Sequence, residues 1–150
     1  MRLRAVQEFL TSQRVCSLTT LLKDGAPHAA ALHYSHHMDP IELYFSTEKT
    51  SKKCQALLYG NSTKGSVVIG FSEEEWITLQ LDGDVQAIFY PSELRTVHAI
   101  HYAKHPDSEK YRDDPLTIFL KFVPSWWRYT NFKTDPVTII SSNHSGTSSR

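Results

Sequence analysis

The chain has 150 residues, 40% of them hydrophobic and 11% aromatic, which is enough for one globular domain with a real core. Sixteen basic side chains balance sixteen acidic ones, so the formal charge is zero and nucleic-acid binding is not indicated. The two cysteines lack metal-ligand spacing, the N-terminus does not look like a signal peptide, and no apolar run approaches membrane-spanning length. We therefore expect a cytoplasmic protein with no membrane partner.

The first third of the chain reads as a helix followed by strands. Apolar residues recur at helical spacing from Leu3 to Leu10 and predict a helix over residues 3–13. Strands are expected at residues 15–22, 28–34 and 42–45, with a hairpin turn at Asp24-Gly25 and a break at residues 36–40. The second strand carries alanine at positions 29–31. Such small side chains either let a flat ligand or another backbone approach closely, or pack beneath a bulky neighbour.

Residues 43–53, with the sequence LYFSTEKTSKK, form the strongest candidate site. A strand ends here, and a helix is expected to open at Thr50 or Ser51 and to run to residue 59. Lys52 and Lys53 would then share its first turn with two hydroxyl groups, where backbone N–H groups lack partners and the helix dipole is positive. Such a corner attracts an anion, above all a phosphate. The alternative is a solvated helix start with an ordinary serine or threonine cap.

The second half of the chain is expected to contain three further strands and one further helix. The strands cover residues 64–71, 77–89 and 116–123, and the helix covers residues 91–104. The strand at 77–89 alternates apolar and polar residues around Gly83, which is typical of a long strand that bends at a barrel corner. Six short strands with helices at two corners predict a mostly β fold, a small antiparallel barrel over residues 1–140, followed by a disordered polar tail over 141–150.

Three histidines, His98, His101 and His105, lie on one side of the expected second helix. Imidazoles at helical spacing can bind a metal or contact haem iron, or they can form a helix edge against a partner subunit or solvent. No cysteine or carboxylate completes a metal site at a recognisable spacing, so we assign no metal. The run Glu73-Glu74-Glu75 reads as a solvated loop.

Five segments together resemble the flavin-binding split-barrel proteins related to pyridoxamine 5'-phosphate oxidase, particularly their short, general-stress-protein-like members. The segments are DGAPHAAAL (24–32), YFSTEKTSKK (44–53), NSTKGSVVIGF (61–71), WITLQLDGDVQ (76–86) and PSWWRYTNF (124–132). Their order and spacing extend the resemblance over residues 15–136. It implies a six-stranded antiparallel split β-barrel that pairs as a homodimer, with an FMN in each of two clefts between the subunits.

The resemblance also implies which residues hold the flavin. The family's phosphate-binding segment, a threonine and then a serine followed by two basic residues, falls on Thr47, Ser51, Lys52 and Lys53, with Ser46 beside them. The other implied cofactor residues are Ala30, Ala31, Leu32 and His33 against the isoalloxazine, Thr78 where oxidases have a glutamine, and Trp126 and Trp127 near the other subunit's cofactor. Adjacent strand residues face opposite ways, so one of the two tryptophans is expected in the core.

Departures from the family pattern bear on the function. The oxidases usually carry an arginine where Ala30 stands, and Lys52 replaces an arginine, which loses the bidentate fork for phosphate. The chain also lacks the basic C-terminal motif that holds pyridoxal phosphate, so pyridoxamine 5'-phosphate oxidase activity itself is not expected.

The sequence therefore predicts an FMN-binding protein, either a small oxidoreductase of unknown substrate or a non-catalytic protein that binds or senses flavin or haem. Related families on the same barrel use a deazaflavin or bind haem, and both ligands stay open as alternatives. A third alternative is a barrel without a cofactor that serves as a dimeric interaction module.

Overall fold

The computed structural model describes residues 2–57 and 60–142. In chain order its elements are α1 (Arg2–Ser12), β1 (Val15–Leu21), β2 (Pro27–His33), β3 (Ser35–His37), β4 (Glu42–Glu48), the 3-10 helix η1 (Lys52–Cys54), β5 (Ser62–Ile69), β6 (Ile77–Ala87), α2 (Pro91–Lys104), the 3-10 helix η3 (Pro106–Tyr111), β7 (Thr117–Asn131) and β8 (Thr138–Ser141). Within the described ranges, no helix has the length and apolar character needed to cross a bilayer.

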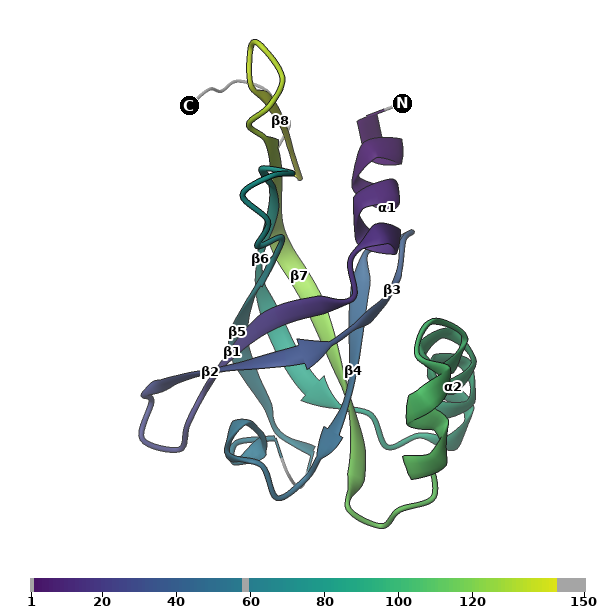
Figure 1. The fold of residues 1–150 in the computed structure, drawn as a ribbon. Coiled ribbons are helices and arrows are strands. Elements are labelled where there is room, and N and C mark those ends of the chain that lie inside the picture. Colours follow the sequence, from purple (N-terminus) through teal and green to yellow (C-terminus); the bar gives the residue numbers. More distant parts are fainter. Residues whose placement is uncertain (1, 58–59, 143–150) are drawn as a thin grey trace.

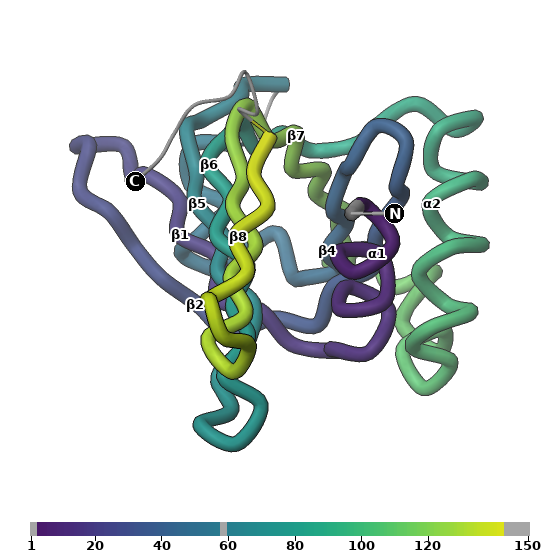
Figure 2. The backbone as a smooth tube through the Cα atoms, turned by 90° about the horizontal axis from the view of Figure 1, so that it is seen from above, coloured from purple at the N-terminus to yellow at the C-terminus, as the bar shows by residue number. Residues whose placement is uncertain are grey.

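One antiparallel sheet runs in the order β2-β1-β5-β6-β7-β4-β3, and β8 pairs with β7 beside this path. The two end strands, β2 and β3, follow each other in the chain with only Tyr34 between them. The sheet therefore curls back towards its own first edge, as Figures 1 and 2 show. This arrangement confirms the predicted split barrel.

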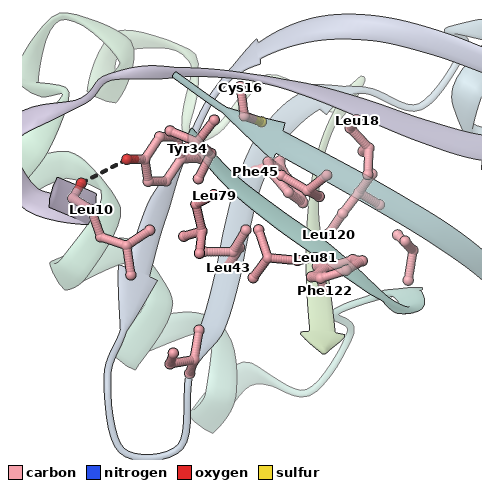
Figure 3. Packing of buried hydrophobic residues seen from close by; sticks show 14 of the residues in the cluster. Leu10, Cys16, Leu18, Tyr34, Leu43, Phe45, Leu79, Leu81, Leu120 and Phe122 are labelled. Carbon is pink, nitrogen blue, oxygen red and sulfur yellow. Dashed lines mark hydrogen bonds between the residues drawn. The ribbon is translucent and has the colours of Figure 1, made fainter. Parts of the chain in front are cut away.

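The barrel core is filled from alternate positions of the strands, because successive strand residues face opposite sides of a sheet. Leucine and phenylalanine side chains from β1, β4, β6 and β7 meet inside the barrel in Figure 3. The hydroxyl of Tyr34 donates a 2.6 Å hydrogen bond to the carbonyl oxygen of Leu10 and thereby fixes α1 to the barrel.

A second, smaller core lies on the outer side of β4 and β7, where α2 covers the sheet. Its buried members are Tyr44, Ile88, Val97, Tyr102 and Phe119. Figure 1 shows α2 beside the barrel, next to β4. Successive residues of β4 thus alternate between two cores: Leu43 and Phe45 face the barrel interior, and Tyr44 faces α2.

Gly83 breaks the register between β6 and β7, as its central position in the long strand predicted. The pairing shifts between Asp82 and Gly83, and Gly83 lies opposite Pro124. A β-carbon at position 83 would collide with the carbonyl oxygen of Val123, so only glycine allows the two backbones to approach this closely.

The structure corrects five sequence-based expectations. The described part holds eight strands and not six, because β3 and β8 were not anticipated, and β7 continues past Pro124 to Asn131. The helix expected over residues 51–59 is a 3-10 helix over Lys52–Cys54 followed by turns, and residues 58–59 lie outside the described residues. The polar loop after α2 contains η3. Ser141, the first residue of the expected tail, belongs to β8, and residues 143–150 lie outside the described residues.

Candidate functional site

The corner between β4 and η1 contains the residues predicted to hold a phosphate. Ser46 and Thr47 end β4 and pair with Phe119 and Ile118 of β7. Because Phe119 belongs to the α2 core and Ile118 to the barrel core, Ser46 faces α2 whereas Thr47 faces the barrel interior. Only Thr47 therefore points to the side on which η1 lies.

The chain after β4 turns under the β1–β2 hairpin, as Figure 1 shows, and η1 contacts both strands. The hydroxyl of Thr20 donates a 3.1 Å hydrogen bond to the carbonyl oxygen of Lys53 and ties η1 to β1. The hydroxyl of Ser51 donates to the carbonyl oxygen of Glu48 at 2.7 Å. Ser51 therefore stabilises the turn with its proton and keeps only acceptor capacity for a ligand.

Lys53 has an unusual environment for a lysine. Its residue surface is only 9% exposed, whereas Lys52 is exposed. Among the described residues, the ion pairs involve other side chains, and none joins a carboxylate to Lys53. The Nζ atom of Lys53 is not among the buried, unpartnered side-chain atoms of the described residues, so its stem is buried while its ammonium group reaches the surface, where it can attract an anion.

The four β2 residues predicted to line the flavin ring alternate between the two faces of the strand. Ala30 and Leu32 pair with the buried residues Leu18 and Cys16 and point inwards, while Ala31 and His33 point outwards. Their side chains therefore cannot all face one ring. A shared contact would have to use the β2 backbone, which the small alanines leave accessible.

Trp126 and Trp127 point to opposite sides of β7, as strand alternation predicted. Trp127 packs against the barrel core. Trp126 lies on the outer face, where it borders a shallow pocket of about 390 Å³ together with Ser17, Gln80 and Asp82 of neighbouring strands.

The guanidinium of Arg128 lies 5.4 Å from the Trp126 ring centroid, and its Nε atom is buried without a hydrogen-bond partner. Thr78 is on the same outer face of β6 and pairs with Thr130 of β7. Within one chain, Thr78 and Trp126 therefore lie on the outer face of the sheet. Thr47 and the turn that carries Lys53 lie on its inner side.

The histidines form a row of imidazole rings rather than a metal site. The ring centroids of His33 and His105 are 4.9 Å apart, and so are those of His105 and His101. Nδ1 of His101 lies 2.7 Å from the Ser35 hydroxyl oxygen. Among the described residues, no group of three or more metal-ligating side chains is arranged to hold an ion.

Sequence reasoning missed the partners of these histidines, because they lie 66 and 71 residues away in the chain. Nε2 of His105 donates to the carbonyl oxygen of Tyr34 at 2.7 Å, and its Nδ1 is buried without a partner. Burial lowers the pKa of His101 to about 3, and the neighbouring His105 adds to this effect. Burial also lowers the pKa of His105, so the inner imidazoles are neutral at physiological pH.

A larger pocket of about 820 Å³ lies between α2 and the start of β7. Its walls are mainly apolar, with Leu94 and Phe119 among them, and three basic residues line it: Lys49, His98 and Arg112. Burial lowers the pKa of His98, and Arg112 acts in the same direction. Arg112 also pairs with Glu109 at 3.4 Å and Asp113 at 3.9 Å, which partly offsets its charge.

A family model described as pyridoxamine 5'-phosphate oxidase matches residues 3–131. The chain belongs to this family. The match covers the barrel strands, α2 and the whole of β7, including the predicted site residues from β2 to Trp127. No curated protein matches the chain.

Solved structures share the fold at low sequence identity. A Clostridium acetobutylicum protein related to general stress protein 26 of Bacillus subtilis is 17% identical, with 94% of each chain covered and a TM-score of 0.69. A haem-binding protein from Mycobacterium smegmatis is 15% identical at a TM-score of 0.70, with 89% of this chain and 54% of that chain covered. The chain thus spans about half the length of the mycobacterial protein.

The haem storage protein HutZ from Vibrio cholerae is also similar, with 12% identity, 81% of this chain and 89% of that chain covered, and a TM-score of 0.68. Identities this low show a common fold and do not transfer a ligand. The ligand of this chain must therefore be argued from its own residues.

Proposed function

We propose that the protein binds FMN, with the phosphate at the β4–η1 corner, and acts as a small flavin-dependent oxidoreductase. The observation that carries this proposal is Lys53, a mostly buried lysine without a carboxylate partner among the described residues. The turn that holds it packs against β2, the strand that the family resemblance places beside the flavin.

The residues at the corner fit a phosphate monoester. The Lys52 and Lys53 ammonium groups offset the two negative charges, and Thr47 faces the same side with a hydroxyl donor. Ser51 contributes less than the resemblance implies, because its proton is already donated to Glu48. With Ala30 in place of an arginine, the lysines supply most of the electrostatic attraction.

The proposal includes a homodimer. Thr78 and Trp126 lie on the outer face of the sheet, whereas Thr47 and Lys53 lie on its inner side. A flavin that contacts both sets would have to lie between two subunits, with Trp126 supplied by the second one. The pocket beside Trp126 supports an interface at this face.

Bound FMN would supply the redox chemistry, while the chain's own residues would bind and orient it. The lysine pair would hold the phosphate, and the β2 backbone beside the alanines would let the ring approach the barrel. His33 would lie at the ring edge and is backed by the neutral imidazole of His105. The neutral imidazole of His105 adds no positive charge behind His33.

The test compares two ligands that differ only in the phosphate. FMN and riboflavin are titrated into wild-type protein and into the double variant Lys52→Ala, Lys53→Ala, with quenching of flavin fluorescence as the readout. We expect the double variant to bind FMN about 10- to 100-fold more weakly and riboflavin unchanged. Lys110→Ala, which removes an exposed lysine on η3, is the matched control. Unchanged FMN affinity in the double variant would contradict the site.

Haem is the second candidate, and the 820 Å³ pocket favours it. A porphyrin needs an apolar cavity, an axial imidazole and cations for its propionates, and the pocket offers apolar walls, His98, Lys49 and Arg112. Two of the similar folds are those of a haem-binding protein and a haem storage protein. Hemin titration should then give a Soret band that His98→Ala shifts or abolishes. If FMN binds and hemin gives no saturable spectrum, this second candidate is wrong.

A further inference from the structure

The β5–β6 connection and the turn after β7 expose an aromatic cluster that plays no part in the proposed flavin site. Phe71, Trp76 and Phe132 are 60%, 52% and 48% exposed, although side chains of this size are usually buried. All three line one hollow of about 390 Å³, which we call the aromatic hollow. Its remaining walls are Gly70, Ser72, Glu73, Ile77 and Thr78.

The ring of Trp76 is held at the edge of this hollow by the backbone. Trp76 has a φ of 52°, a left-handed conformation that is rare and costly for a bulky residue. Its N–H donates to the carbonyl oxygen of Ser72, and its own carbonyl oxygen accepts from the N–H of Phe132 at 2.9 Å. The Trp76 and Phe132 rings meet edge to face, 6.1 Å apart at 84°. Two hairpin ends thus hold two aromatic rings in a fixed arrangement.

The electrostatic character of the hollow is acidic. Glu73 lines it, and Glu74 and Glu75 follow in the same connection. Glu75 accepts a hydrogen bond from the side chain of Gln13, which anchors the connection to α1. No lysine, arginine or histidine is among the described residues that line the hollow; Lys133 follows Phe132 in the chain but is not part of the wall. The hollow therefore combines three aromatic side chains with the Glu73 carboxylate, which forms no ion pair among the described residues.

We propose that the aromatic hollow binds a quaternary ammonium group, such as that of choline or of a trimethylated lysine side chain. Aromatic rings attract cations through the negative charge of their faces, and a trimethylammonium group matches such a site because it is large, weakly hydrated and cannot donate hydrogen bonds. Glu73 would add an opposite charge at the rim. An apolar partner would gain nothing from the carboxylate, and an anionic partner would be repelled by it.

The hollow shares no residue with the phosphate corner of Thr47, Ser51, Lys52 and Lys53, but its wall residue Thr78 is also one that the resemblance implies near the flavin. Trp76, Phe132 and Glu73, which would hold the cation, are not among the residues proposed to contact FMN, so quaternary ammonium binding should persist in protein saturated with FMN. If saturating FMN abolishes the binding, the cofactor occupies the hollow and this proposal is wrong.

The experiment uses choline and its neutral isostere 3,3-dimethyl-1-butanol, which has the same shape without the charge. Each is titrated into the 150-residue protein and followed by calorimetry. We expect saturable choline binding at least about fivefold tighter than binding of the alcohol. Equal binding of the two ligands, or no saturable choline binding, would overturn the proposal. A peptide with trimethyllysine is then compared with its unmodified lysine form and with choline. The tighter of the two quaternary ammonium ligands shows whether the hollow prefers a free small molecule or a protein side chain.

Two variants locate the binding. Trp76→Asn removes the ring but suits the left-handed backbone, and it should weaken choline about tenfold. Glu73→Gln keeps the shape and removes the charge, and it should weaken choline but leave the alcohol unchanged. Tyr90→Ala, which removes an aromatic residue that is 74% exposed and lies outside the hollow, is the matched control. Circular dichroism establishes that each variant is folded. Undiminished choline affinity in folded Trp76→Asn would overturn the assignment.

Discussion

Acid should destabilise the protein through His101, which is buried between α2 and β3. The residue is 1% exposed, and burial lowers its pKa from 6.5 to about 3. Between these two pH values the unfolded chain binds a proton that the folded chain excludes, so the free energy of unfolding falls as the pH falls below 6.5. Each pH unit in this window costs about 1.4 kcal/mol. Lowering the pH from 7.5 to 5.0 should therefore cost about 2 kcal/mol through His101 alone.

Urea unfolding at pH 7.5 and 5.0 measures this cost. His101→Asn removes the titration and retains a side chain that can hydrogen-bond to Ser35, so its loss of stability between the two pH values should be about 2 kcal/mol smaller than that of the wild type. His36, whose pKa is lowered to about 4, contributes equally to both proteins and cancels. His37→Asn, which removes an exposed imidazole from β3, is the control. Identical pH dependence in His101→Asn and wild type would refute the reasoning.

Three further predictions concern packing and reactivity. Gly83→Ala should lower the free energy of unfolding by about 3 kcal/mol in urea titrations, because a β-carbon would meet backbone on β7, and a loss below about 1 kcal/mol would contradict the close approach. Tyr34→Phe should lower the free energy of unfolding by only about 1 kcal/mol, because Lys104 also donates a hydrogen bond to the carbonyl oxygen of Leu10. An unchanged free energy of unfolding would argue against the hydrogen bond of Tyr34. Burial raises the pKa of the Cys16 thiol to about 12, so iodoacetamide should label it only in denaturant, and labelling of the folded protein by mass spectrometry would disprove its burial.

The strand pattern of the second half was predictable because its residues obey a single physical rule. The period-two alternation of β6 fixes which residues face the core, and Gly83 marks the irregularity where the strand bends. The same rule correctly separates Trp127, which packs on the core, from Trp126, which faces outwards. The alternation along one strand was sufficient to predict which side chains are buried here, because it decides which face of the sheet each side chain occupies.

Strand ends were harder to predict, because tertiary contacts decide them. Pro124 suggested the end of a strand, yet β7 continues beyond it to Asn131. Proline lacks an N–H donor, and it is tolerated here because it lies opposite Gly83, where the ladder is already interrupted. β3 has only three residues, and β8 only four, so neither provides enough alternation to be recognised from sequence.

The candidate phosphate corner was located by sequence, but its chemistry was not. Cys54 and Leu57 are both buried in the barrel, and the chain reaches them through a 3-10 turn in place of the expected α-helix. The turn buries Lys53 and uses the proton of the Ser51 hydroxyl for itself. The proposed anion attraction therefore rests on the ammonium groups of Lys52 and Lys53 and much less on the helix dipole that the sequence suggested.

The choice between FMN and haem depends on which nitrogen atoms the histidines leave available. Iron ligation needs an accessible lone pair on an imidazole. Nε2 of His105 donates its proton to the carbonyl oxygen of Tyr34, so the remaining lone pair is on Nδ1, which is buried. Nδ1 of His101 is engaged by Ser35 inside the fold. His98, which borders the 820 Å³ pocket, is therefore the helix histidine best placed to reach a ligand without unfolding its surroundings.

Flavin binding does not need an accessible imidazole on α2. In our proposal it depends on Lys53 and the neighbouring residues of the β4–η1 corner. The two ligands therefore require different residues of the same barrel, and the variants separate them. A haem protein should lose its Soret band with His98→Ala and keep it when Lys52 and Lys53 are replaced. A flavoprotein should lose FMN affinity with the lysine pair and be indifferent to position 98. We expect the second pattern, because no carboxylate among the described residues pairs with Lys53, whereas Arg112 of the 820 Å³ pocket is already paired with Glu109 and Asp113.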